Sequence, residues 1–335
     1  MKRNHSKQGK CLWIILSVLF WLSNIHYSFA AEAGTIRLGV PLQVSAAISL
    51  VAVDQGYFAK EGLKVAVKDF PSGLQALNEG LLAGEVDIVS TAEVPAVFAS
   101  FARNDFSILA SIGAIDGYSN IVASVKSGIR KPADLKGKRI ATLKGAAVHF
   151  YLHLFLLKNH LSEKDIKLSY MKIDELPEAL ASGKIDAFSS TDLSVSQAKA
   201  KLGSDGIVVF EEPNLYAYIY VLVASKKFVS ENPDAAKSIL KALIRAEEFI
   251  KKQPEDAMKI VSKKLNLPLT EFADSWSKSS FKVQLPQSLI LAMEDEARWV
   301  RDSKLVESNT LPNYLDYIHI DSLKSVRPRS VGIIR

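Results

Sequence analysis

The most chemically suggestive stretch of the sequence is ATLKGAAVHFYLH, residues 141–153, where a strand-like run meets a helix-like run. The predicted helix begins without Ser, Thr, Asp or Asn to cap it. If Gly145 is the N-cap, the amides of Ala146, Ala147 and Val148 have no intrahelical partner. These amides, with the positive end of the helix dipole, could bind an anion, or water could satisfy them.

Three histidines lie on one face of the same predicted helix, which raises the question of a metal site. A helix rises ~1.5 Å per residue, so His149 and His160 are ~16 Å apart and cannot bind one ion. His149 and His153 could supply two ligands, but the H-E-x-x-H pattern is absent. We therefore expect no metal, and a hydrogen-bonding or packed role for His149.

Two earlier segments carry polar residues where a predicted strand gives way to a helix. Gln43 and Ser45 could offer donors there, or could form an ordinary turn with a serine cap. Thr91 and Glu93 lie at the corresponding edge of a later strand. A carboxylate near a bound anion costs energy unless the ligand also carries positive charge, so Glu93 bears on the class of ligand.

A fourth segment, IDAFSSTDLS, places Thr191 and Asp192 after another predicted strand. Either residue could simply cap the following helix, and either could contact a ligand. Two carboxylates, Glu93 and Asp192, together with one set of free amides, predict a ligand with both signs of charge, such as an amino-sulfonate.

Residues 1–33 read as a secretory signal peptide. The apolar core CLWIILSVLFWL is shorter than the ~20 residues that span a bilayer, and cleavage sites fit after Ala30 or Ala33. An uncleaved membrane anchor is the alternative. Cys11 is the one cysteine of the sequence, so the exported chain has no disulfide or thiolate nucleophile. Removal of the leader leaves 38 basic residues against 36 or 35 acidic ones, a net charge of +2 or +3. So small a positive charge is not typical of a nucleic-acid-binding protein.

From residue 35 onward, strand-like and helix-like segments alternate, as in an α/β fold with mostly parallel sheets flanked by helices. About 300 residues are too many for one typical core, so we expect two lobes. The strand-like run AYIYVLVAS, residues 217–225, precedes a long helical tail.

Four motifs in order resemble the periplasmic solute-binding proteins of ABC importers for nitrate, sulfonates and taurine, and the related binders of thiamine precursors. The motifs are IRLGV…DQGYFAKEGLKVAV, GEVDIVSTAEVPAVFA, KPADLKGKRIATLKGAAVHFYLHLFLLKNHL and ALASGKIDAF. The resemblance implies a two-lobed type II periplasmic-binding-protein fold with two crossover strands. Residues 34–120 and 220–335 would form lobe 1, and residues 121–219 lobe 2, closing on a ligand by hinge motion.

The strand-end positions and the resemblance together predict ten ligand-binding residues: Gln43, Ser45, Thr91, Glu93, Gly145, Ala146, Ala147, His149, Thr191 and Asp192. The sequence departs from the family pattern at two places. Relatives commonly have Gly-Ser-Ser where this chain has Gly145 and two alanines, and they often have Trp, an acidic residue and Pro where it has Thr-Asp-Leu.

We therefore predict a monomeric, non-enzymatic solute receptor in the periplasm that delivers a small solute to an ABC permease and needs no cofactor or nucleic acid. One alternative is an enzyme of pyrimidine-precursor synthesis on the same scaffold, although the cysteine-bearing motif of those enzymes is absent. A ligand-sensing receptor on the same fold is another.

Overall fold

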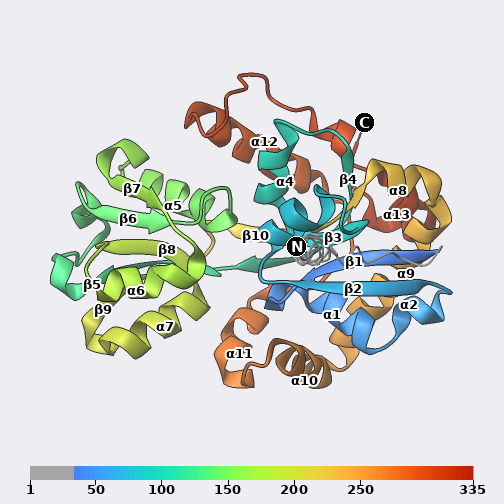
Figure 1. Cartoon of the computed structure of the whole chain (residues 1–335), viewed down its shortest axis with the longest axis horizontal. Helices are drawn as coiled ribbons and strands as arrows, with labels where there is room; N and C mark the ends of the chain where they lie inside the picture. The colour runs from blue at the N-terminus through green and yellow to red at the C-terminus, as the bar shows by residue number, and fades with distance from the viewer. Residues whose placement is uncertain (1–33, 335) are drawn as a thin grey trace, which may run out of the picture. The chain divides into compact units, whose positions relative to one another are not determined.

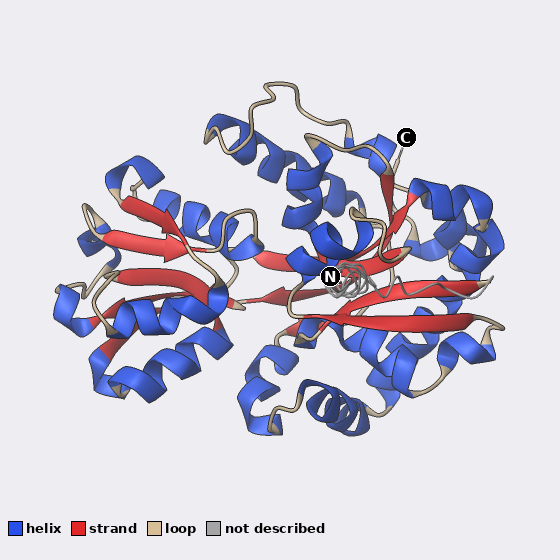
Figure 2. Ribbon diagram, viewed as in Figure 1, coloured by secondary structure: helices blue, strands red, loops and turns tan. Residues whose placement is uncertain are grey.

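The computed structural model describes residues 34–334, and the predicted signal peptide lies outside the described residues. Thr35 to Arg335 form one compact unit, which contains two β-sheets with helices on both faces of each (Figures 1 and 2). None of the helices in residues 34–334 combines the length and the apolar composition needed to cross a membrane.

The first sheet has six strands, and we call the part of the chain built on it the first lobe. Its strands, in spatial order, are β11 (Ser279–Ser280), β4 (Phe106–Asp116), β10 (Ala217–Ser225), β3 (Ile88–Ala92), β1 (Thr35–Pro41) and β2 (Lys64–Phe70). Its helices are α1 (Ala47–Asp54), α2 (Tyr57–Lys60), α3 (Gly73–Gln75), α4 (Glu93–Ser100), α8 (Lys226–Glu231), α9 (Pro233–Lys252), α10 (Pro254–Leu265), α11 (Leu269–Ser277), α12 (Gln287–Asp302) and α13 (Ile320–Val326).

The second sheet has five strands and forms the second lobe. Its strands, in spatial order, are β7 (Lys167–Tyr170), β6 (Arg139–Thr142), β8 (Ala187–Thr191), β5 (Ser119–Ser124) and β9 (Ile207–Phe210). Its helices are α5 (Ala147–Lys158), α6 (Leu176–Ala181) and α7 (Asp192–Leu202).

Both sheets are mixed rather than mostly parallel, which corrects the expectation from the sequence. The parallel pairs are β1 with β2 and β3, and β6 with β7 and β8. β10 and β5 instead run antiparallel to their neighbours, because each enters its sheet directly after the chain has crossed from the other lobe. Local hydrophobic patterns identify such strands but not their direction.

The chain passes between the lobes twice, at residues 117–118 between β4 and β5, and at residues 211–216 between β9 and β10. The predicted lobe boundaries at 120/121 and 219/220 fall inside β5 and β10. Two short crossings at one edge allow one lobe to rotate against the other.

The two lobes repeat one local ion pair. In the first lobe, the Arg37 guanidinium contacts the Asp87 carboxylate at 2.6 Å, and the Arg37 amide donates to the same carboxylate at 2.8 Å. In the second lobe, Arg139 and Asp186 make the same two contacts at 2.7 and 2.8 Å. Each aspartate precedes a fully buried strand, β3 or β8.

Each of these buried strands ends at an acidic residue that starts a helix: Glu93 after β3 and Asp192 after β8. We call Ser90–Glu93 the first corner and Ser189–Asp192 the second corner. The repeat of strand, acidic residue and helix places the two corners at the same edge of their sheets, where parallel strands end.

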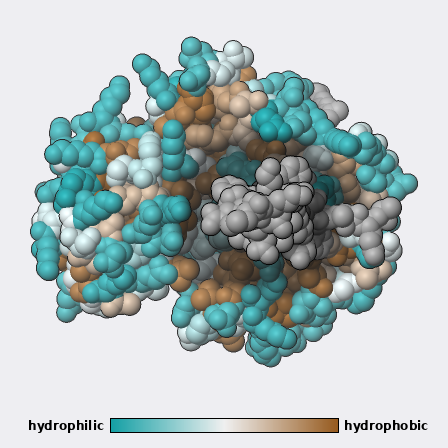
Figure 3. Space-filling model, in the orientation of Figure 1, coloured by the Kyte–Doolittle hydropathy of each residue, from teal (hydrophilic) through white to brown (hydrophobic). Residues whose placement is uncertain are grey.

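The lobes have separate apolar cores, but the start of α5 contacts the core of the first lobe. Ala147, Val148 and Phe150 join the cluster built on the first sheet, whereas Leu152 and Phe155 pack in the second lobe. At the outer edges of the view in Figure 3 hydrophilic residues predominate, as expected for side chains that face water.

Candidate functional site

A small cavity lies between the lobes, where strands of both sheets end. Its volume is about 40 Å³. The first lobe contributes Gln43, Ser72, Gly73, Leu74, Ala92, Pro95, Tyr218 and Tyr220, the second lobe contributes Leu143, Ala146, Ala147, Val148, Ile173 and Thr191, and Tyr118 lies at the first crossing. The start of α5 therefore faces the opening between the lobes.

Gly145 turns the chain from β6 toward α5, and its φ of +75° is a conformation that favours glycine. The N-cap of α5 is Ala146 rather than Gly145, which corrects the predicted helix start by one residue. The Ala146 amide donates to the Leu143 carbonyl at 3.3 Å. Within residues 34–334 the amides of Ala147 and Val148 have no protein partner. Both residues line the cavity, so these two donors are placed to meet a ligand.

Gln43 and the Ser72–Gly73 turn form the facing wall. The Gly73 amide donates to the Gln43 side-chain oxygen at 3.4 Å, which ties two loops of the first lobe together. A Cβ atom on Gly73 would lie 3.0 Å from the Thr91 Cα atom, so a side chain at this position would push the loop toward the cavity.

Three tyrosines complete the cavity: Tyr118 at the first crossing, and Tyr218 and Tyr220 on β10. The Tyr118 and Tyr218 rings meet edge to face at 5.4 Å, and the Tyr218 hydroxyl lies 2.5 Å from the Ser119 hydroxyl. Burial raises the pKa of Tyr118 to about 12 and raises the pKa values of Tyr218 and Tyr220 well above the usual value, so all three hydroxyls stay protonated. The sequence reasoning missed these residues, although the alternation in AYIYV was a usable signal.

Among the described residues that line the cavity, none carries a charge. Backbone amides, hydroxyls and the Gln43 amide are the polar groups, and Leu74, Pro95, Leu143, Val148 and Ile173 supply apolar surface. The wall therefore suits an anionic head group held by neutral donors, with an apolar body beside it.

Glu93 is fully buried but does not line the cavity. Its carboxylate accepts hydrogen bonds from the Tyr216 hydroxyl at 2.6 Å and the Ile219 amide at 3.1 Å. Burial raises the pKa of Glu93 to about 7, and burial together with the nearby Glu93 also raises the pKa of Glu296 well above its usual value. Glu93 thus connects α4 to the start of β10 and is not directed at a solute.

Asp192 is half-buried and also lies outside the cavity lining. One of its oxygens accepts a hydrogen bond from the Asn120 side chain at 2.7 Å, and the other has no partner among the described residues. Burial raises its pKa, and Lys278 and Asp274 of the first lobe are close enough to affect it. The two carboxylates on which a ligand with both signs of charge was predicted thus lie outside the cavity lining, and only Asp192 keeps an oxygen without a partner among the described residues.

His149 is buried against the aromatic rings of Tyr170 and Trp299, with ring centroids 5.2 and 4.8 Å away. Neither ring nitrogen has a hydrogen-bond partner among the described residues, and Nε2 lies 3.8 Å from the Glu163 carboxylate. Burial lowers the pKa of His149 to about 4, so the ring is neutral near pH 7. His149 of the second lobe thus packs against Trp299 of the first lobe.

The cavity brings together four of the ten residues predicted for the site and leaves six outside its lining. The four that line it are Gln43, Ala146, Ala147 and Thr191. The others are Ser45 and Thr91, which are buried behind the first-lobe wall, Gly145, which forms the turn, and Glu93, His149 and Asp192 as described above.

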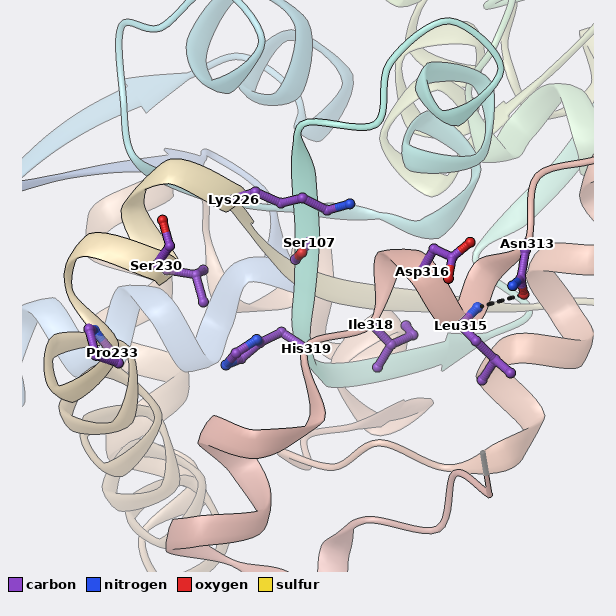
Figure 4. Close-up of a pocket in the computed structure, with 10 residues that line it drawn as sticks. Ser107, Lys226, Ser230, Pro233, Asn313, Leu315, Asp316, Ile318 and His319 are labelled. Carbon is purple, nitrogen blue, oxygen red and sulfur yellow. Dashed lines mark hydrogen bonds between the residues drawn. The ribbon is translucent and has the colours of Figure 1, made fainter.

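A larger groove, of about 720 Å³, lies on the first lobe and shares no residue with the cavity (Figure 4). Lys226, Asp316 and His319 border it, and the Leu315 amide donates to the Asn313 side chain at 3.3 Å. None of the residues predicted for the site lies there, so volume alone does not identify the site.

Two lobes on two sheets, joined by two crossings around a cavity, are the architecture of periplasmic binding proteins. The alkanesulfonate-binding protein SsuA from Xanthomonas axonopodis pv. citri, solved with bound MOPS, matches with a TM-score of 0.73. The match covers 87% of this chain and 100% of that one at 23% identity, which establishes the fold.

The chain belongs to the NMT1/THI5-like family, whose model matches residues 43–257. A protein of Bacillus subtilis (strain 168), named for aliphatic sulfonate binding, is 30% identical over 264 residues, which cover 76% of this chain and 77% of the relative. The taurine-binding periplasmic protein of Escherichia coli (strain K12) is 26% identical over 243 residues, or 69% of this chain and 74% of that protein.

Proposed function

We propose that this protein is the periplasmic solute-binding component of an ABC importer, and that its solute is a small organic sulfonate or a similar anion. The observation that carries the proposal is the uncharged cavity at the start of α5, with two unpartnered amides on one side and three tyrosine side chains on the other. The names of the two relatives support the same class of solute.

The donors around the cavity can hold an anion without a compensating lysine or arginine. A hydrogen bond to a charged group contributes ~1.5–3 kcal/mol, so a few such bonds account for micromolar binding. A neutral wall also favours release, because no buried cation is left without a partner when the anion leaves.

The cavity must widen before a solute can enter. One water molecule needs ~10–15 Å³ of such space, so about 40 Å³ holds only a few waters and no alkanesulfonate. Rotation of the lobes about the two crossings would open it, and re-closure on the solute would give a form that a permease can recognise. We propose that the protein acts as a monomer and performs no chemistry on the solute.

Calorimetry with a matched pair of sulfonates tests the solute class. Taurine and propane-1-sulfonate differ in one end group, an ammonium in taurine and a methyl in the other. Because no carboxylate lines the cavity, we expect propane-1-sulfonate to bind at least ~10-fold more tightly, since an unpaired buried ammonium costs more than ~1.4 kcal/mol. Tighter binding of taurine would contradict the inference that an uncharged wall selects the solute, and binding of neither sulfonate would contradict the proposed class of solute.

A pyrimidine of the thiamine pathway is the second candidate, because three tyrosine rings around a cavity could also hold a flat heterocycle. A Haemophilus influenzae relative named for thiamine biosynthesis, 28% identical over 258 residues, supports including it. In the same calorimetry, submicromolar binding of the hydroxymethylpyrimidine, with no binding of either sulfonate, would favour this candidate.

A further inference from the structure

A second opening bridges the lobes on the side of α5 and α12. It has a volume of about 660 Å³, within the ~300–1,000 Å³ of small-molecule sites. We call it the α5–α12 groove. Its lining includes Phe150 and His153 of α5, Tyr216 at the second crossing, and Glu296, Arg298 and Trp299 of α12.

Three aromatic rings form one wall of this groove. The Phe150 ring lies 5.2 Å from the Tyr216 ring and 5.1 Å from the Trp299 ring, at angles of 87° and 49°. Faces of tyrosine and tryptophan attract cations through the ring quadrupole, most strongly where water is excluded.

Glu296 lines the same groove and forms a buried carboxyl pair with Glu93, which lies outside the lining. Both side chains are fully buried, and the Tyr216 hydroxyl donates to Glu93 at 2.6 Å and lies 3.5 Å from Glu296. Glu296 Oε2 has no hydrogen-bond partner among the described residues. No lysine or arginine of residues 34–334 forms an ion pair with either carboxyl, although buried charges in proteins are usually paired.

The rim already has one more carboxylate than cations, and the buried pair adds to the preference for a positive ligand. Arg298 pairs with Asp295 and with Glu294, and Asp302 accepts a hydrogen bond from Arg301 at 2.7 Å. The buried pair adds negative charge that no protein cation offsets.

We propose that the α5–α12 groove is a second ligand site, which binds a small organic ammonium ion against Phe150, Tyr216 and Trp299, in front of Glu296. The proposal does not rest on the solute of the central cavity. The two long walls of the groove belong to different lobes. The affinity for an ammonium ion should therefore depend on the angle between the lobes, which couples its binding to lobe closure.

The direct test is calorimetry with choline and with 3,3-dimethyl-1-butanol, its neutral isostere. We expect saturable binding of choline below ~10 mM, and at least ~10-fold weaker binding of the isostere, because the charge supplies the cation–π attraction. Equal binding of the two, or no saturable choline binding in this range, would overturn the proposal.

Two variants locate the site. Glu296→Gln keeps the shape and removes the carboxyl that lines the groove, and Trp299→Leu removes a ring face and leaves the carboxyl pair intact; each should weaken choline binding at least ~5-fold. Glu248→Gln, the same change at an exposed position of α9, should leave it unchanged. Unchanged binding in Trp299→Leu would overturn the proposal even if Glu296→Gln fails to fold.

Proton release gives an independent readout. Burial and mutual repulsion raise the pKa of both carboxyls, so the pair holds a proton near pH 7. A cation bound in front of Glu296 should lower the proton occupancy of the pair, so that binding releases a fraction of a proton to the buffer. The measured binding enthalpy should then change with the ionisation enthalpy of the buffer. This dependence should vanish in Glu296→Gln, and its persistence there would count against the site.

Discussion

The first and second corners have the same local construction but different surroundings. Each follows a buried strand, and each ends at an acidic residue that starts a helix. Glu93 at the first corner is sealed between α4, α12 and the start of β10, whereas Asp192 at the second corner is half-buried and held by Asn120 alone. The same sequence pattern therefore has two outcomes. In the first lobe its acidic residue, Glu93, holds the second crossing in place, whereas in the second lobe its acidic residue, Asp192, stays half-buried.

The largest expected effect is on stability when the two acidic residues are truncated. Glu93→Ala leaves the buried Ile219 amide without its acceptor and the Tyr216 hydroxyl with only the longer contact to Glu296, and we expect a loss of about 3 kcal/mol in the free energy of unfolding. Asp192→Ala deprives only the Asn120 side chain of its acceptor, and we expect about 1 kcal/mol. Urea unfolding measures both, and an equal or larger loss for Asp192→Ala would break the comparison.

The next effect is the pH dependence of stability that Glu93 brings. Its pKa is about 7 in the folded protein and near 4.5 when unfolded. The folded state therefore binds the proton more tightly, so this stabilisation is complete below pH 4.5 and is lost as the pH rises through 7.

Unfolding curves of the wild type and of Glu93→Gln between pH 4.5 and 8 isolate this dependence. We expect the wild type to lose stability relative to the variant as the pH rises, by on the order of 2–3 kcal/mol across that range. Part of the wild-type slope should remain in the variant, because Glu296 is buried beside it. Parallel curves for the two proteins would contradict the assignment.

The smallest effect concerns the ion pair that both lobes repeat. The Arg37 side chain is more covered than that of Arg139, at 28% against 48% exposure. Arg37→Met should therefore cost about 1 kcal/mol, and Arg139→Met should cost less, because water screens the more exposed pair. Thermal unfolding of the two variants under one set of conditions measures the difference, and a larger shift for Arg139→Met would reverse the ranking.

The sequence predicted those features that depend on neighbouring residues. The α/β alternation and the uncapped start of α5 follow from local patterns and needed only a one-residue correction at Ala146. The mixed direction of the sheets did not follow, because strand pairing is set by residues far apart in the chain. Glu93 is an example, since its partners Tyr216 and Ile219 lie more than 120 residues away.

The same reason explains which site residues were missed. Thr191 and Ala147 could be predicted because each lies where a strand gives way to a helix, while Tyr118 lines the cavity only because the chain crosses between lobes at that point. Exposure could not be predicted either: an acidic residue at a strand end reads as a surface group, but α12 covers Glu93.

The central claim, that backbone donors at the start of α5 hold the solute, can be tested by removing one amide. Ala147 is the first residue of α5, and proline is well tolerated at that position. The extended conformation of Ala146, with φ −102° and ψ 164°, also suits a residue before proline. Leu269→Pro makes the same change at the start of α11, outside the cavity, and serves as the matched control.

Calorimetry of propane-1-sulfonate with these two variants is the deciding measurement. The account predicts that Ala147→Pro weakens binding at least ~10-fold, because a hydrogen bond to a charged group is lost, and that Leu269→Pro binds as the wild type does. Wild-type affinity in Ala147→Pro would show that the solute is held elsewhere and would contradict the account.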